Sequence, residues 1–187
     1  MASIDHLRAQ LTNYEVYYEG SRMLGTATVD LPELKFLTAE ISGAGITGKI
    51  DMPTIGHTES IEVTLNWINI NPDLIQVASQ KSLDLALYGA QHVYNHTSGE
   101  NEVEQVKIEL RGLNKTTTLG KFEPATTTDS KTTLEIIYMK ISLDGKKMIE
   151  LDKLNYVYYA YDKDYLTDTR AALGLTDGGL LSLNAGF

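Results

Sequence analysis

A glycine-rich bend between two strand-like runs constrains this chain more than any other feature. The hexapeptide Gly43-Ala44-Gly45-Ile46-Thr47-Gly48 has the spacing G-x-G-x-x-G, which in a dinucleotide-binding fold follows a strand and opens a helix. Here Pro53 and Gly56 fall within the first turns of any such helix, and proline inside a helix costs about 3 kcal/mol. No apolar period of 3.6 residues follows. The sequence therefore predicts a β-hairpin tip, where glycine supplies positive φ and lets another backbone, from this chain or a neighbour, come close.

Alternation of apolar and polar residues predicts strands along most of the chain. It is clearest at 61–67, where Ile61, Val63, Leu65 and Trp67 share one face. We expect further strands at 14–18, 25–29, 34–41, 83–94, 105–111 and 134–141 and within 146–161, with a turn near 19–20 and a Thr-rich loop at 114–133. The run 134–141 is partly apolar on both faces, which indicates a central strand.

Two short helices are predicted from their end signals. Asn71 as N-cap and Pro72 at the first helical position start a helix that ends near Ser79. Asp164 caps a second helix over 165–173, and Gly174 ends it.

The composition limits the class of protein. The 187 residues suit one domain spanning 1–187, with a core of about 10–175 and a C-terminal extension at 176–187. The absence of cysteine excludes disulfides and thiolate-bound metals. No signal peptide or membrane-spanning run is visible, so we expect synthesis in the cytoplasm and no membrane insertion. The net charge of −9 disfavours sequence-specific binding to nucleic acid.

The candidate chemical sites are weak. His92 and His96 are four residues apart on a predicted strand and turn, with no third ligand, and the acidic run at 162–168 lacks the glycine and glutamate of a calcium loop. No catalytic motif is present, so we expect no metal, no cofactor and no enzymatic activity. Four tyrosines suit either packing or stacking on sugars, which keeps open an alternative function as a monomeric β-sandwich carbohydrate-binding module: Tyr156, Tyr158, Tyr159 and Tyr161.

The order of several sequence blocks resembles the major tail tube protein of contractile-tailed bacteriophages and of phage-tail-like bacteriocins. The first block runs from Leu31-Pro32-Glu33-Leu34-Lys35 through the glycine bend to Ile50 and continues in Ile55-Gly56 and the strand ending at Trp67. The others are Lys107-Ile108-Glu109-Leu110-Arg111-Gly112 and Thr169-Arg170-Ala171-Ala172-Leu173-Gly174-Leu175. The chain differs from shorter members of that family in its long 114–133 loop and its tail beyond Leu175.

The resemblance implies a mainly β fold, an antiparallel β-barrel or sandwich with one or two short helices. It implies homo-hexameric rings that stack into the inner tube of a virion tail or tail-like particle. The implied partners are the tail sheath protein, the baseplate or hub and the tail terminator, with DNA passing through the lumen without sequence-specific binding. A second alternative with the same architecture is the tube protein of a type VI secretion or extracellular injection system.

Two sets of residues are the candidate sites. The resemblance and the glycine bend together assign inter-subunit and inter-ring contacts to the hairpin residues Glu40, Ile41, Ser42, Gly43, Ala44, Gly45, Ile46, Thr47 and Gly48. A hydrated lumen needs polar side chains on one face of a sheet, and the alternation provides such a set in Lys49, Asp51, Gln105, Lys107, Glu109 and Arg111. An ordinary solvent-facing sheet surface explains the same pattern.

Overall fold

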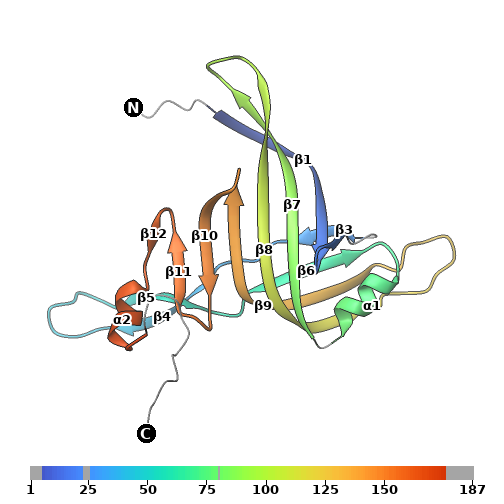
Figure 1. Ribbon diagram of the computed structural model, residues 1–187. Coiled ribbons are helices and arrows are strands. Elements are labelled where there is room, and N and C mark those ends of the chain that lie inside the picture. The colour runs from blue at the N-terminus through green and yellow to red at the C-terminus, as the bar shows by residue number, and fades with distance from the viewer. Residues whose placement is uncertain (1–5, 23–25, 80, 176–187) are drawn as a thin grey trace, which may run out of the picture.

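The computed structural model describes residues 6–22, 26–79 and 81–175, and it is mainly antiparallel β (Figure 1). One sheet follows the path β12-β11-β10-β9-β8-β7-β1-β2, with β6 joined to β9 and β3 joined to β6. Its strands are β1 His6–Tyr18, β2 Ser21–Arg22, β3 Thr26–Asp30, β6 Glu62–Trp67, β7 Ser82–Asn95, β8 Asn101–Thr118, β9 Ser130–Leu143, β10 Lys146–Asp152, β11 Val157–Ala160 and β12 Lys163–Asp164. A separate two-stranded sheet holds β4 Phe36–Ile41 and β5 Ile50–Thr58, and the helices are α1 Pro72–Ala78 and α2 Thr167–Ala172. The predicted fold class is confirmed.

The large sheet bends over itself because β9 belongs to two layers. Residues 130–135 of β9 pair with β6, whereas residues 138–143 pair with β10. The bend coincides with a register shift in β8 at Gly112, where a Cβ would collide with the backbone carbonyl of Glu135. A bulge and a glycine are the usual devices for turning a strand sharply. The prediction that 134–141 is central is thereby confirmed.

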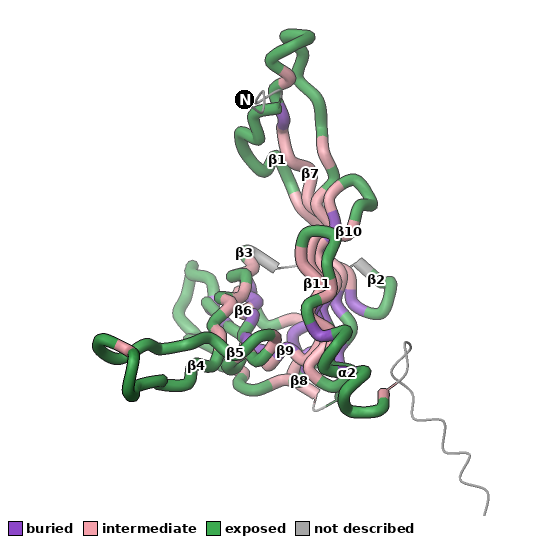
Figure 2. The backbone as a smooth tube through the Cα atoms, turned by 90° about the vertical axis from the view of Figure 1, so that its left-hand side faces the viewer, coloured by how far each residue is buried: buried purple, intermediate pink, exposed green. Residues whose placement is uncertain are grey.

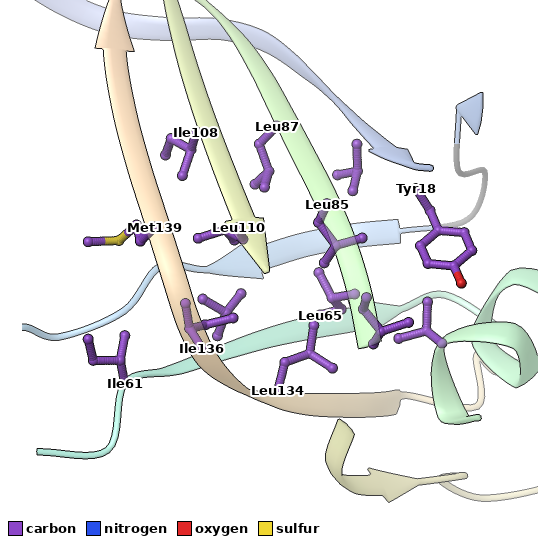
Figure 3. Packing of buried hydrophobic residues seen from close by; sticks show 14 of the residues in the cluster. Tyr18, Ile61, Leu65, Leu85, Leu87, Ile108, Leu110, Leu134, Ile136 and Met139 are labelled. Atoms are coloured by element: carbon purple, nitrogen blue, oxygen red, sulfur yellow. The ribbon is translucent and has the colours of Figure 1, made fainter. Parts of the chain in front are cut away.

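The hydrophobic core fills the space between the two layers (Figure 3). Leu85 and Leu110 of the upper layer face Leu65 of the lower one, and all three are at most 3% exposed. Trp67 is also buried, and its indole N–H donates to the Thr132 hydroxyl at 3.1 Å. The alternation predicted for 61–67 is therefore confirmed, with its apolar side facing the core.

Helix α1 forms as its end signals predict. The Asn71 side chain accepts a hydrogen bond from the Leu74 amide at 2.8 Å, Pro72 occupies the first turn and Ser79 is the C-cap. Leu74 and Val77 are buried against the core. In the described ranges, neither helix has the length or apolar character needed to cross a membrane.

The prediction that Asp164 caps the second helix is wrong. Helix α2 begins after Leu166, which makes no side-chain capping bond. The Asp164 carboxylate instead receives Arg170 Nη2 at 2.6 Å and the Leu166 amide at 3.0 Å. The carboxylate that the sequence predicts as a helix cap therefore forms an ion pair with a buried arginine of that helix. Gly174, with φ of +73°, ends the helix as predicted.

Three strand boundaries also differ from the prediction. Residues 114–118 and 130–133 are not loop, because β8 and β9 pair there, with Thr116 opposite Thr133. At the N-terminus, β1 starts at His6 rather than residue 14, and β3 pairs with β6 rather than returning along β1. Pairing with strands that are distant in the sequence stabilises these segments, and threonine is common in strands as well as in loops. The extension predicted at 176–187 lies outside the described residues.

The long strands give the molecule two projections, visible in Figure 2. Strands β1, β7 and β8 continue past the end of the core as a three-stranded extension, and the β4–β5 hairpin leaves the lower layer almost fully exposed.

Candidate assembly surfaces

The β4–β5 hairpin carries one apolar face that nothing in the described chain covers. Ala39 lies opposite Met52 and Ile41 lies opposite Ile50, so these four side chains share a face, which Leu37 continues by alternation. The four large ones are each 38–49% exposed. A two-stranded hairpin is marginally stable in water by itself. Such a face is suited to burial against another molecule.

The tip of the hairpin is built by its glycines. Gly45 and Gly48 have φ of +91° and +107°, and the Ile46 amide donates to the Gly43 carbonyl at 3.1 Å. No atom lies within 4 Å of a Cβ placed on Gly45. The glycine is therefore required by backbone conformation, and no other part of the described chain comes close to it.

The polar face of the hairpin holds the first two predicted lumen residues. Asp51 lies opposite Glu40, and Lys49 Nζ lies 3.0 Å from a Glu40 carboxylate oxygen. Asp51 lies on β5 of the separate two-stranded sheet and Lys49 immediately precedes that strand, so neither lies on the strand that carries the other four candidates.

The base of the hairpin is fixed on the C-terminal segment. Gly56, with φ of +72°, packs against Leu166, and a Cβ there would lie 2.5 Å from Leu166 Cδ1. The Phe36 ring meets the Tyr158 ring edge-on at 5.5 Å. These contacts set the direction of the hairpin while leaving its tip free.

The remaining candidates lie together on the face of β8 that points away from the core. Gln105, Lys107, Glu109 and Arg111 alternate with buried or half-buried apolar residues along this strand. Lys107 Nζ lies 2.8 Å from Glu109, and Arg111 Nε donates to Asp84 on β7 at 2.6 Å. The sequence prediction of a shared polar face is therefore matched for these four residues.

The cations on this charged face are each paired with a carboxylate of the same subunit. Glu109 also binds Lys140 Nζ on β9 at 3.3 Å, so one carboxylate serves two lysines. The hydrogen bond from Lys107 is the main cause that lowers the pKa of Glu109, and its counterpart raises the pKa of Lys107. Both shifts favour the charged forms of Lys107 and Glu109.

A broad concavity of about 840 Å³ lies on the same face. Tyr17, Tyr88 and Tyr138 line it, with the first two rings in an edge-to-face contact at 5.4 Å. The Tyr138 hydroxyl donates to Glu150 at 3.0 Å, and burial, followed by this bond, raises the pKa of Tyr138. The Tyr138 phenol therefore stays protonated and acts as a neutral polar group at physiological pH.

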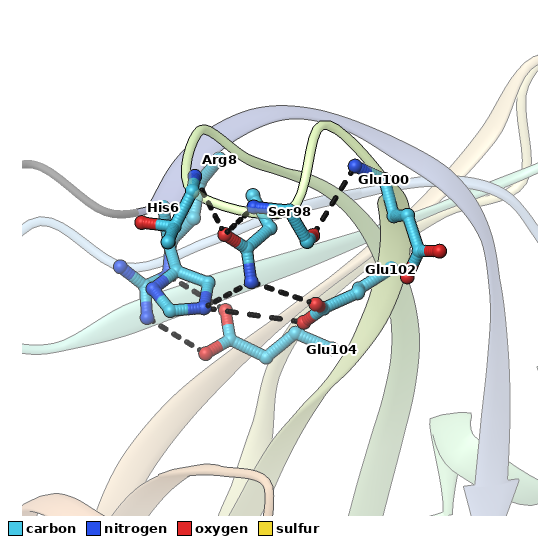
Figure 4. Close-up of polar contacts among 8 residues, drawn as sticks. His6, Arg8, Ser98, Glu100, Glu102 and Glu104 are labelled. Carbon is cyan, nitrogen blue, oxygen red and sulfur yellow. Dashed lines mark hydrogen bonds and ion pairs between the residues drawn. The ribbon is translucent and has the colours of Figure 1, made fainter.

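The three-stranded extension is held by a polar cluster that the sequence analysis missed (Figure 4). Arg8 on β1 donates twice to Glu104 on β8, at 2.6 and 2.7 Å, reaching across β7. His6 Nε2 lies 3.9 Å from a Glu102 carboxylate oxygen, and the Asn95 side-chain amide donates to Glu102 at 2.9 Å. The available signal was the i, i+2 spacing of two basic residues on one strand and of two acids on another, but nothing local pairs those strands.

The tyrosines considered for sugar stacking do not form one platform. Tyr158 packs between Phe36 and Tyr165, and the Tyr159 ring lies under Lys147 Nζ at 3.9 Å. Tyr161 projects into solvent at a turn. Across residues 6–22, 26–79 and 81–175, no group of three histidine, aspartate or glutamate side chains gathers as a metal site requires.

Comparison with known proteins places these surfaces in context. Residues 8–174 match the family model described as phage tail tube protein FII. The chain is 25% identical over 165 residues to the tail tube protein of Escherichia phage P2, an alignment that covers 86% of this chain and 94% of that protein.

One solved structure shows a related fold. A chain from the sheath/tube terminator of an extracellular contractile injection system, PVC, in its extended state superposes with a TM-score of 0.50 at 15% identity, covering 73% of this chain and 97% of that one. A chain from the sheath–tube complex of such a system gives a TM-score of 0.48 at 15% identity, covering 69% and 87%.

Proposed function

We propose that this chain, which belongs to the phage tail tube protein family, closes into rings of six identical subunits that stack into a hollow tube. As a family member it is a structural tube subunit of a phage tail or phage-tail-like particle. We further propose the number of subunits in a ring, the contacts between subunits and the use of the lumen.

The observation that carries the proposal is the uncovered apolar face of the β4–β5 hairpin. The hairpin with its tip at Glu40 to Gly48 extends away from the core, and none of residues 6–22, 26–79 and 81–175 covers its apolar face, so another copy of the chain can bury it. A contact between different surfaces of identical copies produces a ring if the rotation closes and a filament if it does not. A tube of stacked rings uses both kinds of contact.

An open strand edge supports a continuous wall. No strand among residues 6–22, 26–79 and 81–175 pairs with the outer edge of β1 between His6 and Asn13, because β2 pairs only with Tyr17 and Tyr18. Exposed edges of this length invite pairing with another chain. In a ring, each such edge receives a strand from the neighbouring subunit.

We assign the charged face of β8 to the lumen. The opposite face is committed to the core, and Gln105, Lys107, Glu109 and Arg111 offer a hydrated surface whose cations are already held by carboxylates. Lys49 and Asp51, on the polar face of the β4–β5 hairpin, continue the lumen surface where this hairpin contacts the neighbouring subunit. DNA phosphates then find few free cations, so DNA slides without adhering. The sheath protein surrounds the tube, and a baseplate hub and a terminator bind its ends.

Electron microscopy of the purified protein tests the assembly directly. We expect rings or tubes at high protein concentration, and monomers under every condition tried would refute the function. Gly45→Val should leave a folded monomer and block assembly, because only the exposed tip has to change conformation. Gly145→Val is the matched control, since Gly145 also has positive φ and open space around it. Normal tubes from Gly45→Val would remove the hairpin from the interface.

The lumen assignment has its own test. Glu109→Gln removes the carboxylate that Lys107 and Lys140 share, so tubes of this variant should retain DNA that unmodified tubes release at the same salt concentration. Equal retention would place this face outside the lumen. A type VI secretion or extracellular injection tube remains the alternative machine, and neighbouring sheath and baseplate genes distinguish it. A glycan array tests the carbohydrate-binding alternative.

A further inference from the structure

The connection between β8 and β9, residues 119–129, has a tightly bonded neck. The Lys121 amide donates to the Thr128 carbonyl at 2.9 Å, and the Ser130 hydroxyl donates to the Leu119 carbonyl at 2.8 Å. The Thr128 amide donates to the Ile68 carbonyl at 3.2 Å, which ties the loop to the segment after β6. The backbone at the neck is therefore arranged before any partner binds.

This neck displays an aromatic side chain to solvent. Phe122 is 90% exposed, the highest value among the large apolar side chains of the described residues. Leu119, three residues earlier in the same connection, and Ile68 and Ile70 on the segment bonded to it are 37–52% exposed. We call these four residues the Phe122 patch. A large aromatic group on a preorganised backbone has the properties of an interface anchor, because little conformational entropy is lost when it is buried.

The Phe122 patch and the hairpin lie at opposite ends of the molecule. In Figure 1 the β4–β5 hairpin extends to one side and the β8–β9 loop extends to the other, beyond α1. Both project from the layer that contains β6, not from the charged face of β8. Two different apolar surfaces at opposite ends allow identical copies to bind head to tail. Head-to-tail contacts form a ring if the rotation between copies closes.

We propose that the apolar face of the hairpin of one subunit packs on the Phe122 patch of the next copy. The inference rests on the proposed function and names the surface that receives the hairpin. Each half alone exposes apolar area that water disfavours, and the contact covers both. Charged residues adjoin each half: Lys121 and Glu123 precede and follow Phe122 in the chain, and the Lys49–Glu40 pair lies on the opposite face of the hairpin. A dry centre with a polar rim is the usual anatomy of a stable interface.

The three-stranded extension is a less suitable receiver. Its exposed apolar residues include Leu7 on β1, Tyr94 on β7 and Val103 on β8, and these strands run across the line that joins the hairpin to the β8–β9 loop. A contact there relates subunits along another axis, as stacking requires.

Cross-linking tests the contact because the natural chain has no cysteine. Met52→Cys and Phe122→Cys are introduced together, the variant is assembled well above the roughly tenfold higher concentration that loss of the Phe122 ring should require, and the assembled protein is treated with a short bis-maleimide. We expect a ladder of covalent oligomers, whereas each single-cysteine variant should remain monomeric on a denaturing gel. Dimers from Phe122→Cys alone would show a contact between like surfaces and overturn the inference. A double variant with no ladder would overturn it as well.

Assembly of point variants gives an independent measurement. Phe122→Ala should raise the protein concentration needed for tubes by roughly tenfold or more, as for an anchor residue, with an unchanged melting temperature of the monomer. Tyr161→Ala removes another highly exposed aromatic group, 81% exposed, elsewhere on the subunit and should assemble normally. If Phe122→Ala forms normal tubes but no longer binds the sheath protein, the patch serves that partner and the inference is wrong. Failure of the unmodified chain to assemble would refute the tube function itself, and the inference with it.

Discussion

Replacing Gly56 with alanine should destabilise the fold much more than the same change at Gly45. Both glycines have positive φ, which costs an alanine about 1–2 kcal/mol. At Gly45 the added methyl group meets nothing within 4 Å, so the cost ends there. At Gly56 the methyl group would lie 2.5–2.9 Å from three carbon atoms of Leu166, which is 5% exposed. Overpacking of this kind adds about 1–3 kcal/mol, for a total of roughly 2–5 kcal/mol.

Denaturant unfolding of the monomer measures this difference. Trp67 is the only tryptophan and is buried, so its fluorescence reports the core directly. Leu166→Ala opens space at the same site, so its cost should be smaller in the Gly56→Ala background than in the unmodified chain. Equal losses of unfolding free energy for Gly45→Ala and Gly56→Ala, or additive losses in the double variant, would refute the packing argument for the hairpin base.

Three further predictions concern the bend, the extension and the tail. Gly112→Ala should prevent folding or cost several kcal/mol, because its methyl group collides with the Glu135 carbonyl at the bend of β8; a soluble variant with an unchanged melting temperature would contradict this. The hydrogen bond from Arg8 holds the pKa of Glu104 below its usual range, so its stabilisation is present above about pH 4.3 and is lost as the pH falls through the lowered pKa. Acidification from about pH 7 to pH 3 should therefore lower the melting temperature of the unmodified chain more than that of Glu104→Gln, and equal losses would show that the pair adds nothing. Truncation after Gly174 should preserve cooperative melting, since the last helix already ends there; a broad, non-cooperative transition would prove the tail part of the core.

Local patterns were sufficient for the elements whose partners are close in sequence. Asn71 and Pro72 specify the start of α1 through bonds to their own helix, and the 61–67 alternation needs only one buried face. The glycine bend was identified because proline and glycine after it exclude the helix that a nucleotide site needs. These signals depend on short-range backbone chemistry, which any single sequence contains.

Residues whose partners are distant in the chain could not be assigned in this way. Arg8 and Glu104 are 96 positions apart, and only the long β1–β7–β8 register brings them together. Local sequence predicts Asp164 as a helix cap. The arginine that binds its carboxylate instead, Arg170, is buried by tertiary packing, which local sequence does not reveal. The six predicted lumen residues are divided between β8 and the β4–β5 hairpin for a similar reason. Alternation predicts which residues share one face of a strand, but it does not predict which strands share a sheet.

The bend in β9 has a mechanical consequence for a tube under load. One uninterrupted backbone runs from the layer that holds β6 to the layer that holds β10, so thrust applied to either layer reaches the other through covalent bonds. Sliding the layers past one another would require breaking the hydrogen-bond ladders on both sides of the same strand. A subunit built in this way behaves as a stiff block, and the compliance of the whole shaft then resides in the joints between blocks.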